Sequence, residues 1–426
     1  MTASSSYMIV GAGVFGASTA LHLARTLPNA KITLVDQQRP NQAAASSDLN
    51  KVIRADYDDI VYMQLGLEAQ ASWRNDPIFK PWYHESGLLM VEPRGVGRKV
   101  YENYKTLNCA HTGEMLTPEQ VVRRFPVFQN SNWGGVKECL YNSKSGWGEG
   151  DEALGALVQA AIDHGVKFMM ATVNQLHING SGECLGVKIE NGEGSPQVIT
   201  ADTTVLCTGA STAGILADSA PHWDELQAND RIFAVGAVQC TVSYPPEEQE
   251  KLENAPFLFL GYPHTEGEVI PAFKGLLKFN CDKSFTNFVY HKGLEKQLSL
   301  PPSKRTETVF SQDVPESLKK DVQRVVDNTY GRNIQGLVIQ SYRMCWDAMS
   351  PNQDWIIDYH PSCKDLFIAT AGSFHAWKFM PNIGKYVVQG LLGTLSNDLA
   401  RKWAWDREPT GAACSHYIPE QDLKDF

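Results

Sequence analysis

The sequence lacks the features that define several other classes of protein. No stretch approaches the roughly 18 consecutive apolar residues that a membrane-spanning helix needs. No low-complexity linker and no internal repeat interrupts its 426 residues. Lys and Arg number 38 against 48 Asp and Glu, which gives a net charge of -10 without a long basic cluster. We therefore expect neither a membrane protein nor a nucleic-acid-binding protein.

Cysteine pairs with metal-site spacing are also missing. Nine cysteines are scattered along the chain without a Cys-x-x-Cys pair, which argues against a structural zinc site and a disulfide framework. We expect no metal and a reducing, intracellular compartment. The first residues lack the basic region of a signal peptide, and the chain ends in Lys-Asp-Phe, unlike the Ser-Lys-Leu peroxisomal type. The compartment therefore stays open between cytoplasm and peroxisome.

The length and composition predict a folded chain of two lobes. A chain of 426 residues exceeds the size at which one core stops growing. A composition of 43% hydrophobic and 20% charged residues is that of a globular protein. The oligomeric state stays open, with a monomer favoured, and the absence of a heptad pattern excludes only a coiled-coil assembly.

The first forty residues have the pattern of a nucleotide-binding βαβ unit. An apolar strand is predicted at residues 7–10, a helix at 17–27 and a second strand at 32–35. Between strand and helix lies GAGVFG, with Gly11, Gly13 and Gly16 in the G-x-G-x-x-G spacing. The glycines permit a tight turn, approach to a pyrophosphate and close helix–strand packing. Asp36 follows at the distance where an acid binds a ribose hydroxyl, as in NAD or FAD sites.

The α/β pattern then alternates with strand-rich segments. A glycine-rich turn is predicted at residues 146–150, before a helix, and a strand at 205–207 ends in Thr208-Gly209-Ala210. Strand-like runs between about 231 and 335 predict an antiparallel sheet over the substrate. The α/β pattern returns from 336. The lobes are therefore expected to be interwoven.

Five segments, in one order along essentially the whole chain, resemble the sarcosine oxidase and fructosyl amino acid oxidase (amadoriase) family of FAD enzymes, including fungal saccharopine and pipecolate oxidases. They are GAGVFGASTALHL with Asp36, SSDLNKVIRADY, GLLKFN, RMCWDAMSPNQDWIIDYHP and AGSFHAWKFMPNIGKYV. The resemblance implies an α/β chain (α+β overall), in which a Rossmann-like FAD-binding domain is interwoven with an antiparallel-sheet substrate domain. We expect FAD-binding parts at 1–85, 146–230 and 336–426, and substrate parts at 86–145 and 231–335.

The resemblance also implies the residues that hold the cofactor. Cys345 matches the cysteine that the family joins to the flavin 8α-methyl group through a thioether; a buried free thiol is the alternative, and Cys207 and Cys414 are weaker candidates for the attachment. The predicted FAD-binding residues are Gly11, Gly13, Val14, Phe15, Gly16, Asp36, Ser46, Ser47, Lys51, Val173, Thr208, Gly209, Cys345, Asp347, Phe374 and Lys378.

Five residues match or adjoin the family's catalytic positions. Lys378 matches the lysine that holds a substrate carboxylate, and Arg54 resembles a second carboxylate ligand, with a planar fork suited to it. Lys278 matches the lysine over the flavin face, where a positive charge stabilises the anion formed from dioxygen, and Lys51 corresponds to another basic residue there. His375 is either a polar contact or a packed histidine. Surface lysines and an ordinary ion pair are the alternatives for the basic residues.

The chain departs from the family pattern at two places. Sarcosine oxidases carry a histidine shortly after the lysine that matches Lys278, whereas this chain has Asn280-Cys281-Asp282 there. The residues that precede Lys378 are Phe374-His375-Ala376-Trp377, which differ from the family's usual Ser-Gly-His-x-Phe before the lysine. These changes leave the substrate open among N-substituted amino acids, with an aromatic N-methyl amino acid of fungal secondary metabolism, whose imine would cyclise, as an alternative.

The sequence therefore predicts an oxidase that converts a small secondary amine and dioxygen into an imine and hydrogen peroxide. Three rivals remain: an NAD-dependent dehydrogenase, an FAD dehydrogenase feeding another carrier, and a flavin-binding protein without activity.

Overall fold

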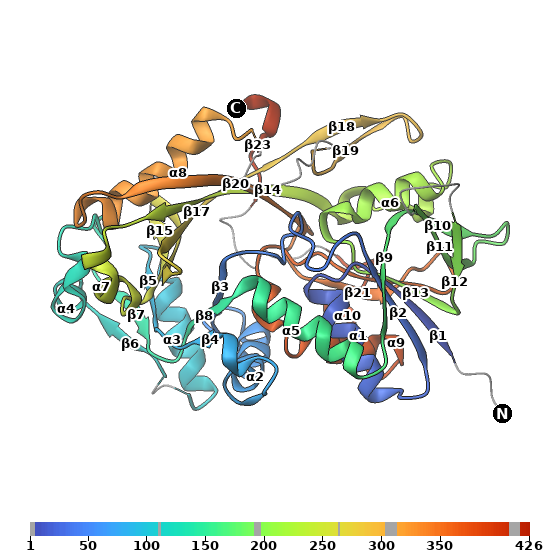
Figure 1. Ribbon diagram of the computed structural model, residues 1–426, viewed down its shortest axis with the longest axis horizontal. Coiled ribbons are helices and arrows are strands. Elements are labelled where there is room, and N and C mark those ends of the chain that lie inside the picture. Colours follow the sequence, from blue (N-terminus) through green and yellow to red (C-terminus); the bar gives the residue numbers. More distant parts are fainter. Residues whose placement is uncertain (1–4, 110–111, 191–196, 263–264, 303–312, 409–417) are drawn as a thin grey trace.

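Two large sheets dominate the computed structural model, which describes residues 5–109, 112–190, 197–262, 265–302, 313–408 and 418–426 (Figure 1). The first sheet has six strands in the order β21-β22-β13-β1-β2-β9. All are parallel except β21, which pairs antiparallel with β22. Their bounds are β1 (Ser6–Val10), β2 (Lys31–Asp36), β9 (Lys167–Met170), β13 (Thr203–Leu206), β21 (Ile356–Tyr359) and β22 (Leu366–Thr370).

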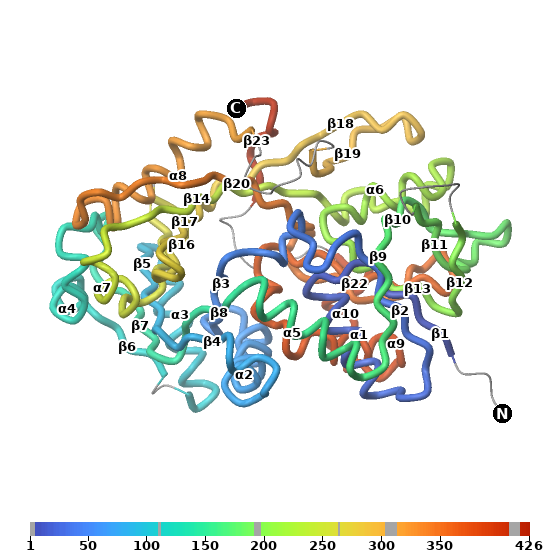
Figure 2. Tube along the Cα trace, in the orientation of Figure 1, coloured from blue at the N-terminus to red at the C-terminus, as the bar shows by residue number. Residues whose placement is uncertain are grey.

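Two helices, one near each end of the chain, pack on this sheet and on one another: α1 (Val14–Thr26) and α9 (Ile383–Leu391). Helix α5 (Gly150–Asp163) packs on α1. Figure 2 shows α1 beside α9, although one lies near each end of the chain. Gly384 makes this approach possible, since a Cβ there would lie 2.2 Å from the backbone of Ser18. Its N–H donates to Oγ of Ser18 at 2.9 Å, so the ends of the chain close around one core.

The second sheet has nine strands and is mostly antiparallel. Its order is β20-β14-β17-β16-β15-β5-β7-β6, with β23 beside β17. Helix α8 (Glu316–Asn328) packs on it through buried Leu318, Val322 and Val325. The bounds are β5 (Leu88–Val91), β6 (Glu114–Leu116), β7 (Cys139–Asn142), β14 (Phe233–Ser243), β15 (Phe257–Tyr262), β16 (Thr265–Phe273), β17 (Leu276–Thr286), β20 (Val338–Met349) and β23 (Gln421–Asp422).

The order of segments agrees with an interwoven chain, because strands of the second sheet lie between strands of the first along the sequence. Strand β20 belongs to the nine-stranded sheet, although it lies inside the segment 336–426 that we assigned to FAD binding. The division into domains therefore remains a prediction, and the sheet itself continues to Met349.

A small sheet joins the two large ones and corrects one expectation. Residues 146–150 do not form a turn: Gly146–Glu149 is β8, which pairs with β3 (Asn50–Ile53) and β4 (Tyr83–His84). The glycines allow close strands, since a Cβ on Gly146 would lie 2.0 Å from the carbonyl oxygen of His84. Glycine composition alone does not distinguish a turn from such a strand.

The remaining longer elements include a three-stranded sheet, β10-β11-β12, and a two-stranded sheet, β18-β19. None of the helices in the described ranges is both long and apolar enough to cross a membrane. The elements are α2 (Ile60–Asn75), α3 (Val96–Thr106), α4 (Pro118–Arg124), α6 (Thr212–Ser219), α7 (Gln249–Glu253), α10 (Asn397–Lys402), β10 (Thr172–Ile178), β11 (Cys184–Glu190), β12 (Gln197–Thr200), β18 (Phe288–His291) and β19 (Lys296–Ser299).

Candidate active site

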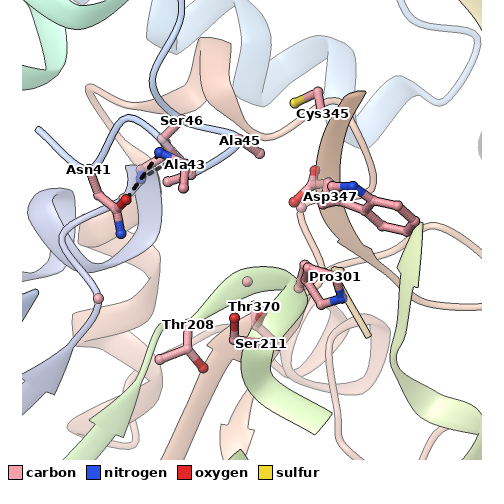
Figure 3. A pocket seen from close by; sticks show the side chains of 18 of the residues that line it. Asn41, Ala43, Ala45, Ser46, Thr208, Ser211, Pro301, Cys345, Asp347 and Thr370 are labelled. Atoms are coloured by element: carbon pink, nitrogen blue, oxygen red, sulfur yellow. Dashed lines mark hydrogen bonds between the residues drawn. The ribbon is translucent and has the colours of Figure 1, made fainter. Parts of the chain in front are cut away.

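A cavity of about 540 Å³ is lined by residues of both large sheets (Figure 3). Figure 3 shows Cys345 and Asp347 on one side of it and the loop that contains Asn41 and Ser46 facing them. The predicted residues that line it are Gly11, Gly13, Val14, Phe15, Asp36, Ser46, Lys51, Val173, Thr208, Gly209, Lys278, Cys345, Asp347, Phe374 and Lys378. Gly16, Ser47, Arg54 and His375 are not among the lining residues.

The glycine turn at one end of the cavity has the backbone that the sequence predicts. Gly11 has φ +96°, and a Cβ there would lie 2.5 Å from the carbonyl oxygen of Cys207. Gly16 lies behind the wall because it packs on Gly11, where a Cβ would meet a carbonyl oxygen at 1.8 Å. Helix α1 begins at Val14, whose N–H donates to Oγ of Ser46 at 2.9 Å. This helix N-terminus can hold the pyrophosphate of a dinucleotide.

Asp36 is fixed at the end of β2. Its carboxylate accepts hydrogen bonds from the N–H of Ala12 at 2.7 Å and from Nδ2 of Asn41 at 2.8 Å. Burial raises the pKa of this carboxyl group, although these donors oppose the rise. Asn41 also lines the cavity and was not predicted from the sequence. An acid and an amide therefore lie together at the end of β2, where the sequence predicts the contact with a ribose hydroxyl.

A strained turn lies against β20 beside the cavity. Ala371, Ser373 and Phe374 have φ of 62°, 50° and 60°, a conformation that costs about 1–3 kcal/mol for each residue without a compensating contact. Asp347 compensates, since its carboxylate accepts from the N–H of Phe374 at 2.8 Å. Burial raises the pKa of Asp347. Cys345, two residues earlier on β20, is buried and lines the same cavity.

The other two candidate cysteines differ in their setting. Cys207 also lines the cavity, and burial raises the pKa of its thiol far above the usual range. Cys414 lies outside the described residues.

A second group of charges surrounds a carboxylate that the sequence analysis missed. Nζ of Lys278 lies 2.5 Å and Nζ of Lys51 3.1 Å from Oδ2 of Asp48. Arg343, on β20, lies 3.8 Å from the same oxygen. Burial lowers the pKa of Lys278 to about 8, against the opposing effect of Asp48. Burial opposes ionisation of Asp48, yet the neighbouring cations hold the pKa of its carboxyl group well below the usual range.

Tyr57 joins three predicted residues at another part of the site. Nζ of Lys378 donates to the Tyr57 hydroxyl at 3.1 Å and to the carbonyl oxygen of His375 at 2.9 Å. The guanidinium of Arg54 lies 4.7 Å from the centre of the Tyr57 ring. Burial lowers the pKa of His375 to about 3, so its ring is neutral near pH 7. The structure thus brings Arg54, His375 and Lys378 together, although only Lys378 lines the cavity.

The comparisons with known proteins identify the family. A model described as FAD dependent oxidoreductase matches residues 6–389. L-saccharopine oxidase of Schizosaccharomyces pombe is 26% identical over 94% of this chain and 93% of its own length. Monomeric sarcosine oxidase of Bacillus sp. is 23% identical over 90% of this chain and 91% of its own length. A solved structure of fructosamine oxidase (Amadoriase II) from Aspergillus fumigatus has a TM-score of 0.80, with 26% identity over 99% of this chain and 94% of that one.

The chain therefore belongs to the FAD-dependent oxidoreductase family and is an enzyme. The residues present fit the cofactor: a glycine turn that a Cβ would obstruct, a helix N-terminus, an acid for the ribose and a cavity of about 540 Å³ meet in one place. The resemblance to saccharopine, sarcosine and fructosyl amino acid oxidases is confirmed, and so is the mixed α/β fold.

Proposed function

We propose that this enzyme oxidises a secondary amine that carries a carboxylate, such as an N-substituted amino acid. The products are the imine and hydrogen peroxide, formed from one substrate molecule and one dioxygen. The observation that carries the proposal is the position of Lys378, which lines the same cavity as Cys345 and Lys278. The oxidases named above, with their sarcosine and saccharopine substrates, support the same chemistry.

Lys378 would bind the substrate carboxylate. Its ammonium group is buried and donates to the Tyr57 hydroxyl and to the His375 carbonyl oxygen, which hold it at the cavity wall. A buried cation gains most from an anionic partner. Arg54 would add a second positive charge for the carboxylate, since its guanidinium lies 4.7 Å from the centre of the Tyr57 ring. The carboxylate would thus be fixed at one end of the substrate, which places the amine at a defined distance from it.

The glycine turn, Asp36 and Thr208 would hold FAD, with Cys345 joined to it through a thioether. When bound, FAD accepts a hydride from the carbon beside the substrate nitrogen and passes the electrons to dioxygen. Lys278 would place a positive charge beside the site of dioxygen reduction and stabilise the developing anion. Lys51 adds a second charge nearby.

The thiols support a proposal for the cellular setting. Eight described cysteines are unpaired, which supports a reducing compartment. We infer a cytoplasmic or peroxisomal enzyme, and the oligomeric state stays open with a monomer favoured.

The carboxylate proposal is tested with a pair of ligands. The apparent Kd of an N-methyl amino acid, and that of the amine that lacks its carboxyl group, are obtained from the concentration dependence of the rate of anaerobic flavin reduction in stopped flow. Lys378→Met should weaken binding of the amino acid about 10- to 150-fold, which corresponds to about 1.5–3 kcal/mol for a charged hydrogen bond. The simple amine should bind equally to both proteins. Equal weakening of both ligands contradicts the proposal.

The dioxygen role is tested separately by stopped-flow kinetics. Lys278→Met should slow reoxidation of the reduced flavin by orders of magnitude, while anaerobic reduction by substrate stays near that of the wild type. Equal damage to both half-reactions would count against this role.

A further inference from the structure

We propose that Asp48 is a positioning residue, which fixes the ammonium group of Lys278 in the cavity wall and keeps it charged while the enzyme works. The inference rests on the proposed function of Lys278 in dioxygen reduction. It goes beyond that function because it names the group on which the charge of Lys278 depends.

The first support is geometric. Oδ2 of Asp48 lies 2.5 Å from Nζ of Lys278, and the same ammonium donates to the carbonyl oxygen of Asn50 at 2.8 Å. Lys278 is 1% exposed and Asp48 6%, so the ion pair has little contact with solvent. An ammonium group in such a place stays charged only when a partner compensates for its lost hydration.

The second support is that four groups converge on this one carboxylate. Besides Lys278, Lys51 lies at 3.1 Å, Arg343 at 3.8 Å, and Nε2 of Gln239 at 3.3 Å. They come from β17, β3, β20 and β14, respectively. Segment 37–49, which connects β2 to β3, is thereby joined to three strands of the nine-stranded sheet and to β3. Arg343 reinforces the connection by donating to the carbonyl oxygen of Ser47 at 2.8 Å.

The third support is the balance of charge around Lys278. Asp48 faces three cations, two of which repel Lys278 and lower its pKa, as burial also does. The residues paired with Lys278 on β14 and β16 are Thr241 and Ile270, and neither is titratable. Glu268 on β16 lines the same cavity, and its carboxylate accepts from Asn280 at 3.2 Å. Asp48 is therefore the acid that compensates the Lys278 charge directly.

The consequence has a definite sign. With Asp48 present, Lys278 has a pKa of about 8, so most of it is charged at pH 7. Removal of the negative charge leaves burial, Lys51 and Arg343, all of which lower the pKa of Lys278. The residue would then lose its proton below neutral pH, and the positive charge beside the dioxygen site would be lost with it.

The experiment follows the titration of Lys278 in the holoenzyme labelled with ¹³C at lysine Cε. Its resonance is assigned by its absence from Lys278→Met. We expect a midpoint near pH 8 in the wild type, and a midpoint lower by about 1–3 units in Asp48→Asn. Asp48→Glu, which keeps the charge but moves it, should shift the midpoint less and in the same direction. Glu268→Gln is the matched control and should leave the midpoint of Lys278 in place.

The pH dependence of flavin reoxidation is measured on the same proteins. The pH above which reoxidation slows should fall in Asp48→Asn together with the Lys278 midpoint. An unchanged midpoint in Asp48→Asn overturns the inference. If that variant does not yield folded holoenzyme, Asp48→Ser takes its place, and an unchanged midpoint there overturns the inference. Normal reoxidation in Lys278→Met instead overturns the proposed function of Lys278, while the shift in its midpoint would stand.

Discussion

The hydroxyl group of Tyr57 accepts a hydrogen bond from Nζ of Lys378 at 3.1 Å. The Tyr57 ring also lies beneath the guanidinium of Arg54, so one aromatic side chain touches both basic residues proposed to bind the substrate carboxylate. Tyr57 is itself buried and packs edge-on against His375. Its function would be to orient these two cations.

Tyr57→Phe removes this hydroxyl and keeps the ring. We expect KM for the carboxylate substrate to rise about 2- to 12-fold, the equivalent of about 0.5–1.5 kcal/mol for one hydrogen bond, with kcat changed much less. Steady-state kinetics with an N-methyl amino acid measure both values. A fall in kcat with unchanged KM would indicate that Tyr57 acts on the chemical step.

Cys345→Ala should convert a covalent flavin into a dissociable one. After acid precipitation, the yellow colour should stay with the wild-type pellet and pass into the supernatant of the variant. Cys207→Ala is the matched control, because Cys207 lines the same cavity, and its flavin should stay attached. The reverse result would assign the linkage to Cys207.

Gly11→Ala places a methyl group where the carbonyl oxygen of Cys207 lies 2.5 Å away, in a backbone conformation with φ +96°. We expect a loss of about 1–3 kcal/mol in the free energy of unfolding, together with weaker FAD retention on gel filtration. Gly155→Ala in α5 has open space around its Cβ and should be neutral or stabilising by up to about 1 kcal/mol. Equal stability of the two variants would show that the turn adapts.

The buried His375 should make the free energy of unfolding depend on pH in the acid range. Its pKa is lowered by burial to about 3, whereas an unfolded histidine titrates near 6.5. Between these values the unfolded chain binds the additional proton, so the free energy of unfolding falls as the pH decreases.

His375→Asn should remove the part of the pH dependence of the unfolding free energy that arises from this histidine. The difference in unfolding free energy between variant and wild type should change by about 1.4 kcal/mol per pH unit between about pH 6 and pH 4, measured by urea denaturation. His164→Asn, at an exposed position, is the control. A constant difference for His375→Asn would show that the folded protein protonates this ring.

The sequence predicted the βαβ unit because its signals are local. Strand, turn, helix and acid follow one another within forty residues, and the structure has β1, α1 and β2 at these places. The joining sheet was missed for the opposite reason. Gly146–Glu149 forms a strand only because β3 and β4 lie on either side, and that contact depends on residues far along the chain.

The site shows the same division. Lys51 and Lys278 were found by resemblance, but Asp48, in the same quoted segment, was overlooked. An acid three positions before Lys51 could equally form an ordinary ion pair on the surface, so the sequence alone gives no reason to assign Asp48 to the site. Only the packing of segment 37–49 against β17 shows that its partner is Lys278. Tyr57 was missed likewise, since an aromatic residue in a polar segment gives no sign of the two cations that approach it.

Strand β14 holds Cys345 and Lys278 at a fixed separation. Cys345 pairs with Ala237 and Lys278 with Thr241, so the sulfur proposed to anchor the flavin and the charge proposed to act on dioxygen flank one strand, four residues apart. At about 3.4 Å per residue this offset is about 14 Å along the strand. Neither Cys345 nor Lys278 can move along β14 without breaking the hydrogen bonds between the strands, so the two residues should behave as one rigid frame. Evolution of a new substrate preference would then proceed at Arg54, Tyr57 and the 374–378 segment, leaving that frame untouched.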